Sequence, residues 1–380
     1  KLEGEDIAFI HIVYLPVPGN IGEMKTKPAQ HSVRELNSVG IQPDFVLCRG
    51  SVPLDNVRRE KLANFCNLSP EHVISAPDVE SIYDIPLNFD REGLTKMILS
   101  KFQYGHKADT MKEWVKKSEK VKKLKLSARR IKIGIVGKYF DTGDFVLEDS
   151  YVSVIEAIKH ASYEYDVFPE IIWIDSKKYE ESPKLLEELA NLHGIIVPGG
   201  FGGSGIEGKI KAIRYCRENK IPYLGLCYGL QLAVVEYARN VCNLDANTTE
   251  IDKDTSEPVV DILPEQRELL RKKKYGASMR LGNYAAVLEP GSKVVQLYGK
   301  ESVVERHRHR YEVNPKYKEI LKKNNLFISG ISPDGKLVEY IELKMHPFFI
   351  ATQAHPEFTS TFDEPNPLFL GLIKASKKRF

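Results

Sequence analysis

The segment Gly225-Leu-Cys-Tyr-Gly229 constrains the fold of this chain more than any other feature. It follows an apolar run at 221–225 and precedes a helical pattern of apolar residues at 231–238. A strand that reverses sharply into a helix strains the residue at its tip, and glycines on both sides let strand and helix approach closely. The pattern therefore predicts that Cys227 stands on a nucleophile elbow, with its thiol projecting into solvent. Backbone amides and the positive end of the helix dipole would stabilise a thiolate there, and an oxyanion formed by its attack.

A histidine and a glutamate follow downstream, at His355 and Glu357. If this segment is extended, the two side chains point to one face, and the carboxylate can orient the imidazole. A lone cysteine is most often a small buried hydrophobe, and a lone histidine a core or turn residue. The combination favours Cys227 as nucleophile, His355 as base and Glu357 as the orienting carboxylate.

Composition limits the class of protein. The chain has 380 residues, 42% of them hydrophobic, which allows two or three domains. Its formal net charge of +3 is small for this length, so no nucleic-acid partner is expected. The five cysteines lack C-x-x-C spacing, which indicates reduced thiols in a cytoplasmic protein and argues against structural zinc. No apolar run approaches the roughly 18 residues of a membrane helix, so no membrane partner is expected.

The first part of the chain, residues 1–105, has the pattern of an α/β domain. We expect strands at 7–15, 45–48 and 73–75, and helices around 31–38 and at 56–66. A domain that opens directly on a strand is typical of the C-terminal part of something larger. The lysine-rich stretch 106–130 is predicted to be a linker, and its charge run is interpreted as a solvated helix or tether.

A second α/β pattern begins at residue 131. Strands are expected at 131–137, 170–174, 194–197 and 221–225, with helices at 150–161, 183–192 and 206–219. This alternation predicts a doubly wound parallel sheet with its active site at the carboxyl ends of the strands. Further β segments are expected at 294–298, 326–331, 337–343 and 348–353, and a polar insertion loop at 253–275.

The glycine-rich run Pro198–Gly205 supplies many backbone amides after a strand. Its G-x-x-x-x-G-K match is followed by Ile210, so the hydroxyl that a P-loop needs for magnesium is absent and a nucleotide site is rejected. The amide of Gly200 is instead the candidate donor to an oxyanion.

Two basic segments remain. In 303–313, alternation puts His307 and His309 on one face with Glu305. The same segment carries Arg306, Arg308 and Arg310. Their charge disfavours a metal, whereas one arginine could clamp an amino-acid carboxylate in two hydrogen bonds; a solvated basic strand is the alternative. In 24–30, two lysines could meet a polyphosphate, although a solvated loop is the stronger interpretation of that segment alone.

Taken together, these motifs resemble the CTP synthase family, whose members aminate UTP with ammonia from glutamine. The similarity spans essentially the whole chain. Its most specific segments are 22–33, 40–44, 197–201, 279–282, 304–313 and 353–360. An elbow cysteine with H-x-E is common to class I glutamine amidotransferases, and the first and fifth of these segments narrow the match.

The resemblance implies two α/β domains. Residues 131–380 would form a flavodoxin-like class I glutamine amidotransferase domain, and residues 1–105 the C-terminal part of a P-loop-type synthetase (amidoligase) domain. Cys227 would attack the glutamine amide, His355 would shuttle the proton and Glu357 would orient His355.

The resemblance also implies the ligand contacts. Glutamine would be bound by Gly200, Tyr228, Gly229, Leu230, Gln231, Glu250 and Arg310, with Glu250 facing its ammonium group and Arg310 its carboxylate. UTP or CTP would be contacted by Lys25, Thr26, Lys27, Pro28, Ala29, Gln30 and Lys61, and ATP by Arg49, Asp78 and Val79. GTP, the allosteric activator, would contact Phe201 and Arg280. At Tyr228 the family usually has leucine, so the larger side chain would alter the pocket.

The implied reaction uses ATP with Mg2+, is inhibited by CTP, and takes place in a homodimer or homotetramer. The family's P-loop and magnesium ligands precede the region that this sequence contains. We therefore expect a piece of a longer protein that hydrolyses glutamine at best. Two alternatives stay open: a class I amidotransferase or thiol hydrolase serving a different ligase, and a non-catalytic assembly module.

Overall fold

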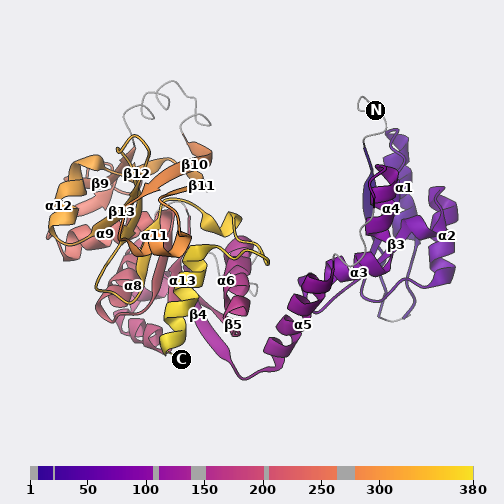
Figure 1. Ribbon diagram of the computed structural model, residues 1–380, viewed down its shortest axis with the longest axis horizontal. Helices are drawn as coiled ribbons and strands as arrows, with labels where there is room; N and C mark the ends of the chain where they lie inside the picture. Colours follow the sequence, from indigo (N-terminus) through magenta and orange to yellow (C-terminus); the bar gives the residue numbers. More distant parts are fainter. Residues whose placement is uncertain are drawn as a thin grey trace. The chain divides into compact units, whose positions relative to one another are not determined.

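The computed structural model describes residues 7–19, 22–105, 111–137, 151–200, 205–262 and 279–379. The chain divides into two compact units, an N-terminal unit, Lys1–Lys123, and a C-terminal unit, Leu124–Phe380 (Figure 1). Within the described ranges, every helix lacks the length and apolar run that a bilayer span requires.

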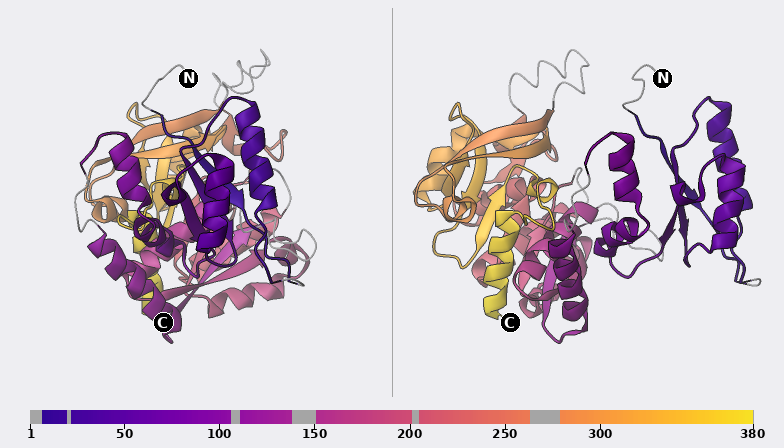
Figure 2. Two further views of the ribbon diagram at one scale, coloured as in Figure 1. Left: turned by 90° about the vertical axis from the view of Figure 1, so that its right-hand side faces the viewer. Right: turned by 45° about the vertical axis from the view of Figure 1, so that its right-hand side comes forward.

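The N-terminal unit is built on a small parallel sheet. Its strands, in spatial order, are β1 (Ile10–Tyr14), β2 (Phe45–Gly50) and β3 (Val73–Pro77). Its helices are α1 (Lys27–Ser38), α2 (Asn56–Cys66), α3 (Ile85–Arg91) and α4 (Leu94–Lys101), with 3-10 turns η1 (Pro70–His72) and η2 (Ile82–Asp84). Side chains alternate along β2: Val46 packs toward α1 and α2, while Phe45 packs toward Leu94 of α4. The right-hand view of Figure 2 shows the sheet between these two helical layers.

The lysine-rich stretch contains the helix α5 (Lys112–Leu126). The indole nitrogen of Trp114 donates to the carbonyl of Tyr83 (2.7 Å), and the Ser118 hydroxyl donates to the Asp84 carboxylate (2.5 Å). Ser118 is buried. The charge run is therefore a helix whose uncharged positions pack on the N-terminal unit.

The C-terminal unit contains a nine-stranded sheet of order β11-β10-β13-β14-β15-β7-β6-β4-β5. Its parallel strands are β4 (Arg130–Gly137), β5 (Phe168–Asp175), β6 (Gly194–Val197), β7 (Tyr223–Leu226) and β15 (Phe349–Thr352). An antiparallel extension adds β10 (Arg280–Leu288), β11 (Ser302–His309), β13 (Phe327–Ile331) and β14 (Val338–Glu342). A second sheet joins β8 (Ala246–Thr248), β9 (Glu257–Ile262) and β12 (Tyr311–Val313). The predicted doubly wound α/β fold is confirmed.

Helices cover both faces of the large sheet (Figure 1). One face carries α8 (Ile206–Glu218) and α9 (Tyr228–Asn240), and the other carries α6 (Val152–Glu164), α11 (Lys293–Tyr298) and α13 (Pro367–Ser376). Shorter elements are α7 (Lys177–Glu181), α12 (Lys318–Lys323) and the 3-10 helices η4 (Pro183–Asn191), η6 (Pro315–Tyr317), η7 (Pro356–Phe358) and η8 (Lys377–Arg379). On β4, Ile133 and Ile135 pack toward α6 while Val136 packs toward α8, because strand side chains alternate.

Two of the segments expected after β7 have a different secondary structure. The segment 294–298 is the helix α11, because the Ser292 hydroxyl accepts the amide of Val295 (3.0 Å) and Gly299 ends the helix with φ +64°. The segment 253–275 is not a loop throughout, since β9 lies within it and buries Val259 and Val260 completely. Residues 263–275 lie outside the described residues. The helix expected at 183–192 is of the 3-10 type.

Acid should destabilise the C-terminal unit through His346, in the turn between β14 and β15. Burial lowers the pKa of His346 from 6.5 to about 4, while its Nε2 donates to the carbonyl of Cys216 (3.1 Å). When folding lowers the pKa of a histidine, the protein keeps its full stability at pH values above the pKa of the unfolded chain. It loses stability as the pH falls toward the pKa of the folded chain, because only the unfolded chain takes up the proton. The free energy of unfolding should fall between pH 6.5 and 4, by at most about 1.4 kcal/mol per pH unit from this histidine.

His346→Gln keeps an N–H donor and removes the titration, so it should flatten this slope and leave the pH 8 value nearly unchanged. Urea unfolding followed by Trp173 fluorescence in a Trp114→Phe background reports the C-terminal unit, since the chain has only two tryptophans. Identical slopes for the original chain and the His346→Gln variant would contradict the assignment.

Candidate active site

Cys227 lies between β7 and α9 in a strained backbone conformation. Its φ is +51° and its ψ −97°, a region that side chains rarely occupy. Three backbone hydrogen bonds hold it: its amide donates to the carbonyl of Thr352 on β15 (2.7 Å), and its carbonyl accepts from the amides of Leu230 (3.1 Å) and Gln231 (3.3 Å). The predicted elbow is confirmed.

The glycines beside Cys227 permit close packing. A Cβ on Gly229 would lie 2.1 Å from the carbonyl oxygen of Val197, and one on Gly225 would lie 2.8 Å from the Cβ of Ala351. Neither distance is tolerated by a real side chain. Strand, elbow and helix can therefore meet only with glycine at these two positions.

The elbow pattern predicted a thiol that projects into solvent, and this prediction is wrong. Cys227 is 4% exposed, because residues from β11 and from the segment after β15 lie against it. Its Sγ is 4.0 Å from the carbonyl oxygen of Arg308 and 3.7 Å from the side-chain nitrogen of Gln353. A substrate must therefore reach the sulfur through a cavity.

His355 and Glu357 form a close pair. The Nδ1 of His355 lies 2.7 Å from Oε1 of Glu357. The sequence analysis supposed that this segment is extended, but Pro356–Phe358 is the 3-10 helix η7, and His355 directly precedes it. The turn brings the carboxylate back to the imidazole, so the predicted pairing forms by a different route.

The imidazole also approaches the thiol. A Cβ on Gly199 would lie 2.8 Å from Cε1 of His355 and 3.6 Å from Cβ of Cys227, so both side chains meet at this glycine. Burial disfavours a charged imidazole, but Cys227 and Glu357 outweigh burial and raise the pKa of His355 to about 10. The arrangement favours a charged imidazolium beside the sulfur of Cys227.

Cys227, His355 and Glu357 line a cavity of about 340 Å³. Its lining includes Pro198, Gly199 and Gly200 after β6, Cys227 after β7, and His355 and Phe358 after β15. These are the carboxyl ends of neighbouring parallel strands, where the doubly wound fold predicts a site. Gly200, the expected oxyanion donor, is part of the lining.

Several expected glutamine contacts gather beside the elbow. The side-chain nitrogen of Gln231 donates to the carbonyl of Tyr311 (2.8 Å). Burial and, after it, the negative charge of Glu250 raise the pKa of Tyr228. The same two causes raise the pKa of Tyr311. The positive charge of Arg310 opposes them at Tyr311. Glu250 and Arg310 thus lie near Tyr311. Of the expected glutamine contacts, only Gly200 is in the described lining of the cavity, and the roles of the others stay predictions.

Gly199→Ala should slow ammonia release from glutamine by about 10- to 100-fold, because the added methyl group displaces the imidazole. The melting temperature should change little, since the nearest atom is the tip of one side chain. Gly105→Ala is the matched control, because a Cβ there meets nothing within 4 Å. An unchanged rate in Gly199→Ala would show that His355 does not act from the position it occupies here.

Comparison with known proteins agrees with this geometry. Residues 146–375 match the family model of class I glutamine amidotransferases, and residues 1–104 match that of the CTP synthase N-terminus. A CTP synthase of Methanococcus maripaludis is 50% identical over 98% of this chain and 69% of its own length. The chain belongs to the CTP synthase family.

Other members of the CTP synthase family give the same picture. A CTP synthase of Methanocaldococcus jannaschii is also 50% identical, over 98% of this chain and 68% of its own length. The solved glutaminase domain of the Trypanosoma brucei CTP synthase, with bound acivicin, is 38% identical with a TM-score of 0.60. That match covers 65% of this chain and 94% of the solved one.

The residues that CTP synthase resemblance assigns to nucleotides lie in the N-terminal unit. The segment Lys25–Gln30 opens α1, after the carboxyl end of β1. Thr26, Ala29 and Gln30 are buried, whereas Lys27, Pro28 and Lys61 are exposed and Lys25 is half-buried.

Arg49 and Asp78 stand at the same edge of the small sheet, with Nη2 of Arg49 2.7 Å from Oδ1 of Asp78. Arg49 also donates to the carbonyl of Ala76 (2.9 Å), and half-buried Val79 follows Asp78. Arg49, Asp78 and Val79 lie at the carboxyl ends of β2 and β3, where an α/β sheet presents ligands, whereas Lys61 lies within α2. The nucleotide roles of all these residues stay predictions.

The two expected GTP contacts have different outcomes. Phe201 lies outside the described residues. Arg280 is largely buried, and its two terminal nitrogens contact Glu312 (3.2 Å) and Glu339 (2.9 Å). Its contact with GTP stays a prediction.

The histidines of β11 point inward with Glu305, as alternation predicts. Nδ1 of His307 lies 2.9 Å from Nε2 of His309, so the two rings share a hydrogen bond. Over the part of the chain that the structure describes, no group of three histidine, cysteine, aspartate or glutamate side chains is placed to hold a metal ion.

Sequence reasoning missed three parts of the site. These are the approach of Gly199 to the imidazole, the carbonyl of Arg308, and the side chain of Gln353. Gln353 stands two residues before His355, which was a usable signal. The other two depend on how distant strands pack and had no local signature.

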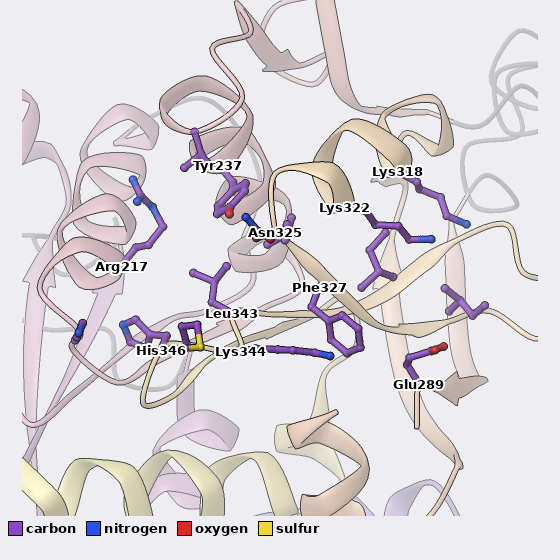
Figure 3. Close-up of a pocket in the computed structure, with 16 residues that line it drawn as sticks. Arg217, Tyr237, Glu289, Lys318, Lys322, Asn325, Phe327, Leu343, Lys344 and His346 are labelled. Atoms are coloured by element: carbon purple, nitrogen blue, oxygen red, sulfur yellow. The ribbon is translucent and has the colours of Figure 1, made fainter. Parts of the chain in front are cut away.

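A larger hollow of about 1030 Å³ lies apart from the thiol (Figure 3). It shares no lining residue with the smaller cavity. Arg217, one of its cations, pairs with Glu236 (2.8 Å), and the ammonium of Lys344 lies 3.6 Å from the centre of the Phe327 ring. These cations make local contacts of the fold.

Proposed function

We propose that this chain hydrolyses glutamine through Cys227, and that the ammonia serves the ATP-dependent conversion of UTP to CTP. One observation carries the first half. A cysteine on a strained elbow shares a cavity of about 340 Å³ with a His355–Glu357 pair whose nearest atoms are 2.7 Å apart. Family membership supports the second half.

The chemistry follows from these three side chains. The sulfur of Cys227 attacks the side-chain carbonyl carbon of glutamine, and the carbonyl oxygen becomes an oxyanion. Backbone amides at the start of α9 and at Gly200 stabilise it. The imidazolium of His355 gives its proton to the departing nitrogen, and ammonia leaves a thioester on Cys227.

Water completes the turnover. Neutral His355 removes a proton from a water molecule that attacks the thioester, and the imidazolium that this produces is the form that began the cycle. Glutamate departs and the thiolate is regenerated. Glu357 holds the imidazole through Nδ1 throughout, which keeps Nε2 available to substrate.

Recognition of glutamine requires an anion for its α-ammonium group and a cation for its α-carboxylate. We assign Glu250 to the ammonium group and Arg310 to the carboxylate, which is supported by the placement of both near Tyr311. Gly200, Tyr228, Gly229, Leu230 and Gln231 complete the proposed contacts. Tyr228 is 2% exposed and packs in the hydrophobic core with α8 and α9.

The synthetase half is assigned to the N-terminal unit. Lys25–Gln30 and Lys61 are proposed for UTP and for the inhibitor CTP, and Arg49, Asp78 and Val79 for ATP. ATP would phosphorylate O4 of UTP, and ammonia would displace that phosphate. Magnesium normally accompanies ATP, but the described residues offer no metal-binding group, so no step through magnesium is derived.

The location and the assembly of the protein are also part of the proposal. All five cysteines are free, which supports a reducing, cytoplasmic setting. GTP as activator and a homodimer or homotetramer follow from family membership alone.

Ammonia release from glutamine by the purified chain, with and without GTP, tests the proposal. Release that depends on Cys227 supports it, and no release under either condition contradicts it. Addition of UTP and ATP then tests the second half. CTP formation would support that half. Failure of UTP to bind would favour an amidotransferase for a different ligase.

A further inference from the structure

Strand β11 holds both ends of the turn that carries the His355–Glu357 pair. At one end, the amide of His355 donates to the carbonyl of Arg306 (2.8 Å). At the other end, the hydroxyl of Thr359 donates to the Glu305 carboxylate (2.7 Å). Neighbouring residues of one strand thus clamp the short turn 355–359 by a backbone contact and a side-chain contact.

The carboxylate of Glu305 is buried and has three donors. Tyr298 donates its hydroxyl to Oε1 (2.8 Å), Asn366 donates its side-chain amide to Oε1 (3.0 Å), and Thr359 takes Oε2. Asn366 also contacts the Thr359 hydroxyl (3.1 Å) and caps α13 through the amide of Leu368. Glu305 is 4% exposed, so its position is set by these contacts and not by solvent.

We propose that Glu305 is a positioning residue for glutamine hydrolysis, which sets the place of His355 and Glu357 relative to Cys227 by anchoring Thr359. The inference rests on the proposed function. The carboxylate of Glu305 bonds to the turn and to its neighbours, not to the sulfur or the imidazole. Its effect therefore passes through the turn. The same strand, β11, also contributes the Arg308 carbonyl, which lies 4.0 Å from Sγ of Cys227. Strand β11 thus contacts both the nucleophile and the turn that carries the base.

Glu305→Ala removes the acceptor of all three donors and frees the far end of the turn. Ammonia release should show a kcat about 10- to 100-fold lower, as for other losses of supporting contacts. The KM for glutamine should stay within about threefold, because the partners of the Glu305 carboxylate, Tyr298, Thr359 and Asn366, are not among the proposed glutamine contacts.

Glu305→Gln should restore kcat to within about threefold of the original chain. Its carbonyl oxygen can accept from Tyr298 and Asn366, and its amide can donate to the Thr359 hydroxyl. Thr359 then donates to the carbonyl of Pro356, which is already 3.0 Å away. A role that required the negative charge of Glu305 would not be rescued in this way.

Glu342→Ala is the matched control. This glutamate on β14 is also buried, and it accepts the amides of Lys293 (3.0 Å) and Val294 (3.3 Å), away from the site. Its loss should lower the melting temperature about as much as Glu305→Ala while leaving kcat within about threefold. Thr359→Val breaks the anchor without touching Glu305, and it should lower kcat in the same direction if Glu305→Ala does not fold.

Hydrogen exchange of the backbone separates this inference from the proposed function. The amides of Phe358 and Thr359 donate within the turn, to His355 and Pro356. Glu305→Ala should speed their exchange by about tenfold or more, and Glu342→Ala should not. Unchanged exchange, or equal kcat losses in Glu305→Ala and Glu342→Ala, would overturn the inference. An inactive original chain with faster exchange in Glu305→Ala would contradict only the proposed function.

Discussion

Replacing Cys227 by alanine is expected to reduce ammonia release from glutamine by at least about 10⁴-fold, to the background of the assay. The thioester cannot form without the sulfur, and its immediate contact Gln353 is an amide that cannot replace it. Alanine tolerates φ +51° no worse than cysteine does, so the fold should be kept.

The measurement is ammonia production under saturating glutamine, together with the melting temperature. Cys242→Ala is the matched control, because Cys242 is a second, half-buried free cysteine just after α9. It should retain full activity. Ammonia release that survives in Cys227→Ala, or that is lost equally in Cys242→Ala, would remove the thiol from the mechanism.

Replacing His355 by alanine should lower kcat for ammonia release by about 10³-fold or more. Two proton transfers are lost, one to the departing nitrogen and one from the attacking water. The positive charge beside the sulfur is lost as well, since Cys227 and Glu357 together raise the pKa of His355 to about 10 despite its burial. Alkylation of Cys227 by iodoacetamide at neutral pH should therefore slow in parallel.

His31→Ala serves as the control, because His31 is an exposed histidine on α1 of the N-terminal unit. It should alter neither ammonia release nor alkylation. If His355→Ala slowed release but left alkylation of Cys227 unchanged, the imidazole would act as a proton shuttle without supporting the thiolate. If it changed neither, the base would have to be another group.

Burial of the thiol has a consequence for both experiments. The sulfur lies in the cavity that Gly199, Gly200 and His355 line, so reagents larger than glutamine should react slowly even in the unaltered chain. The same enclosure protects the thioester from stray water and keeps ammonia from being protonated in solution. Small alkylating agents are therefore the appropriate probes.

The sequence by itself determined the features that depend on local pattern. Alternating apolar strands and helices predicted the parallel core of the C-terminal unit. Glycines around Cys227 predicted the strained elbow, because only glycine permits the close approach to Val197 and Ala351 that this turn requires. The identities of His355 and Glu357 were readable from their spacing, although the turn that joins them was not.

Only the tertiary structure decided the features that depend on distant partners. Two valines, Val294 and Val295, suggested a strand, yet a capping serine and packing against the sheet made a helix. The elbow suggested an exposed thiol, yet strand β11, which lies about 80 residues later in the chain, covers it. The anchor from Glu305 to Thr359 spans 54 residues in the same way. Hydrogen bonds and burial between such distant segments form only when the whole sheet has assembled, so no local pattern of residues can encode them.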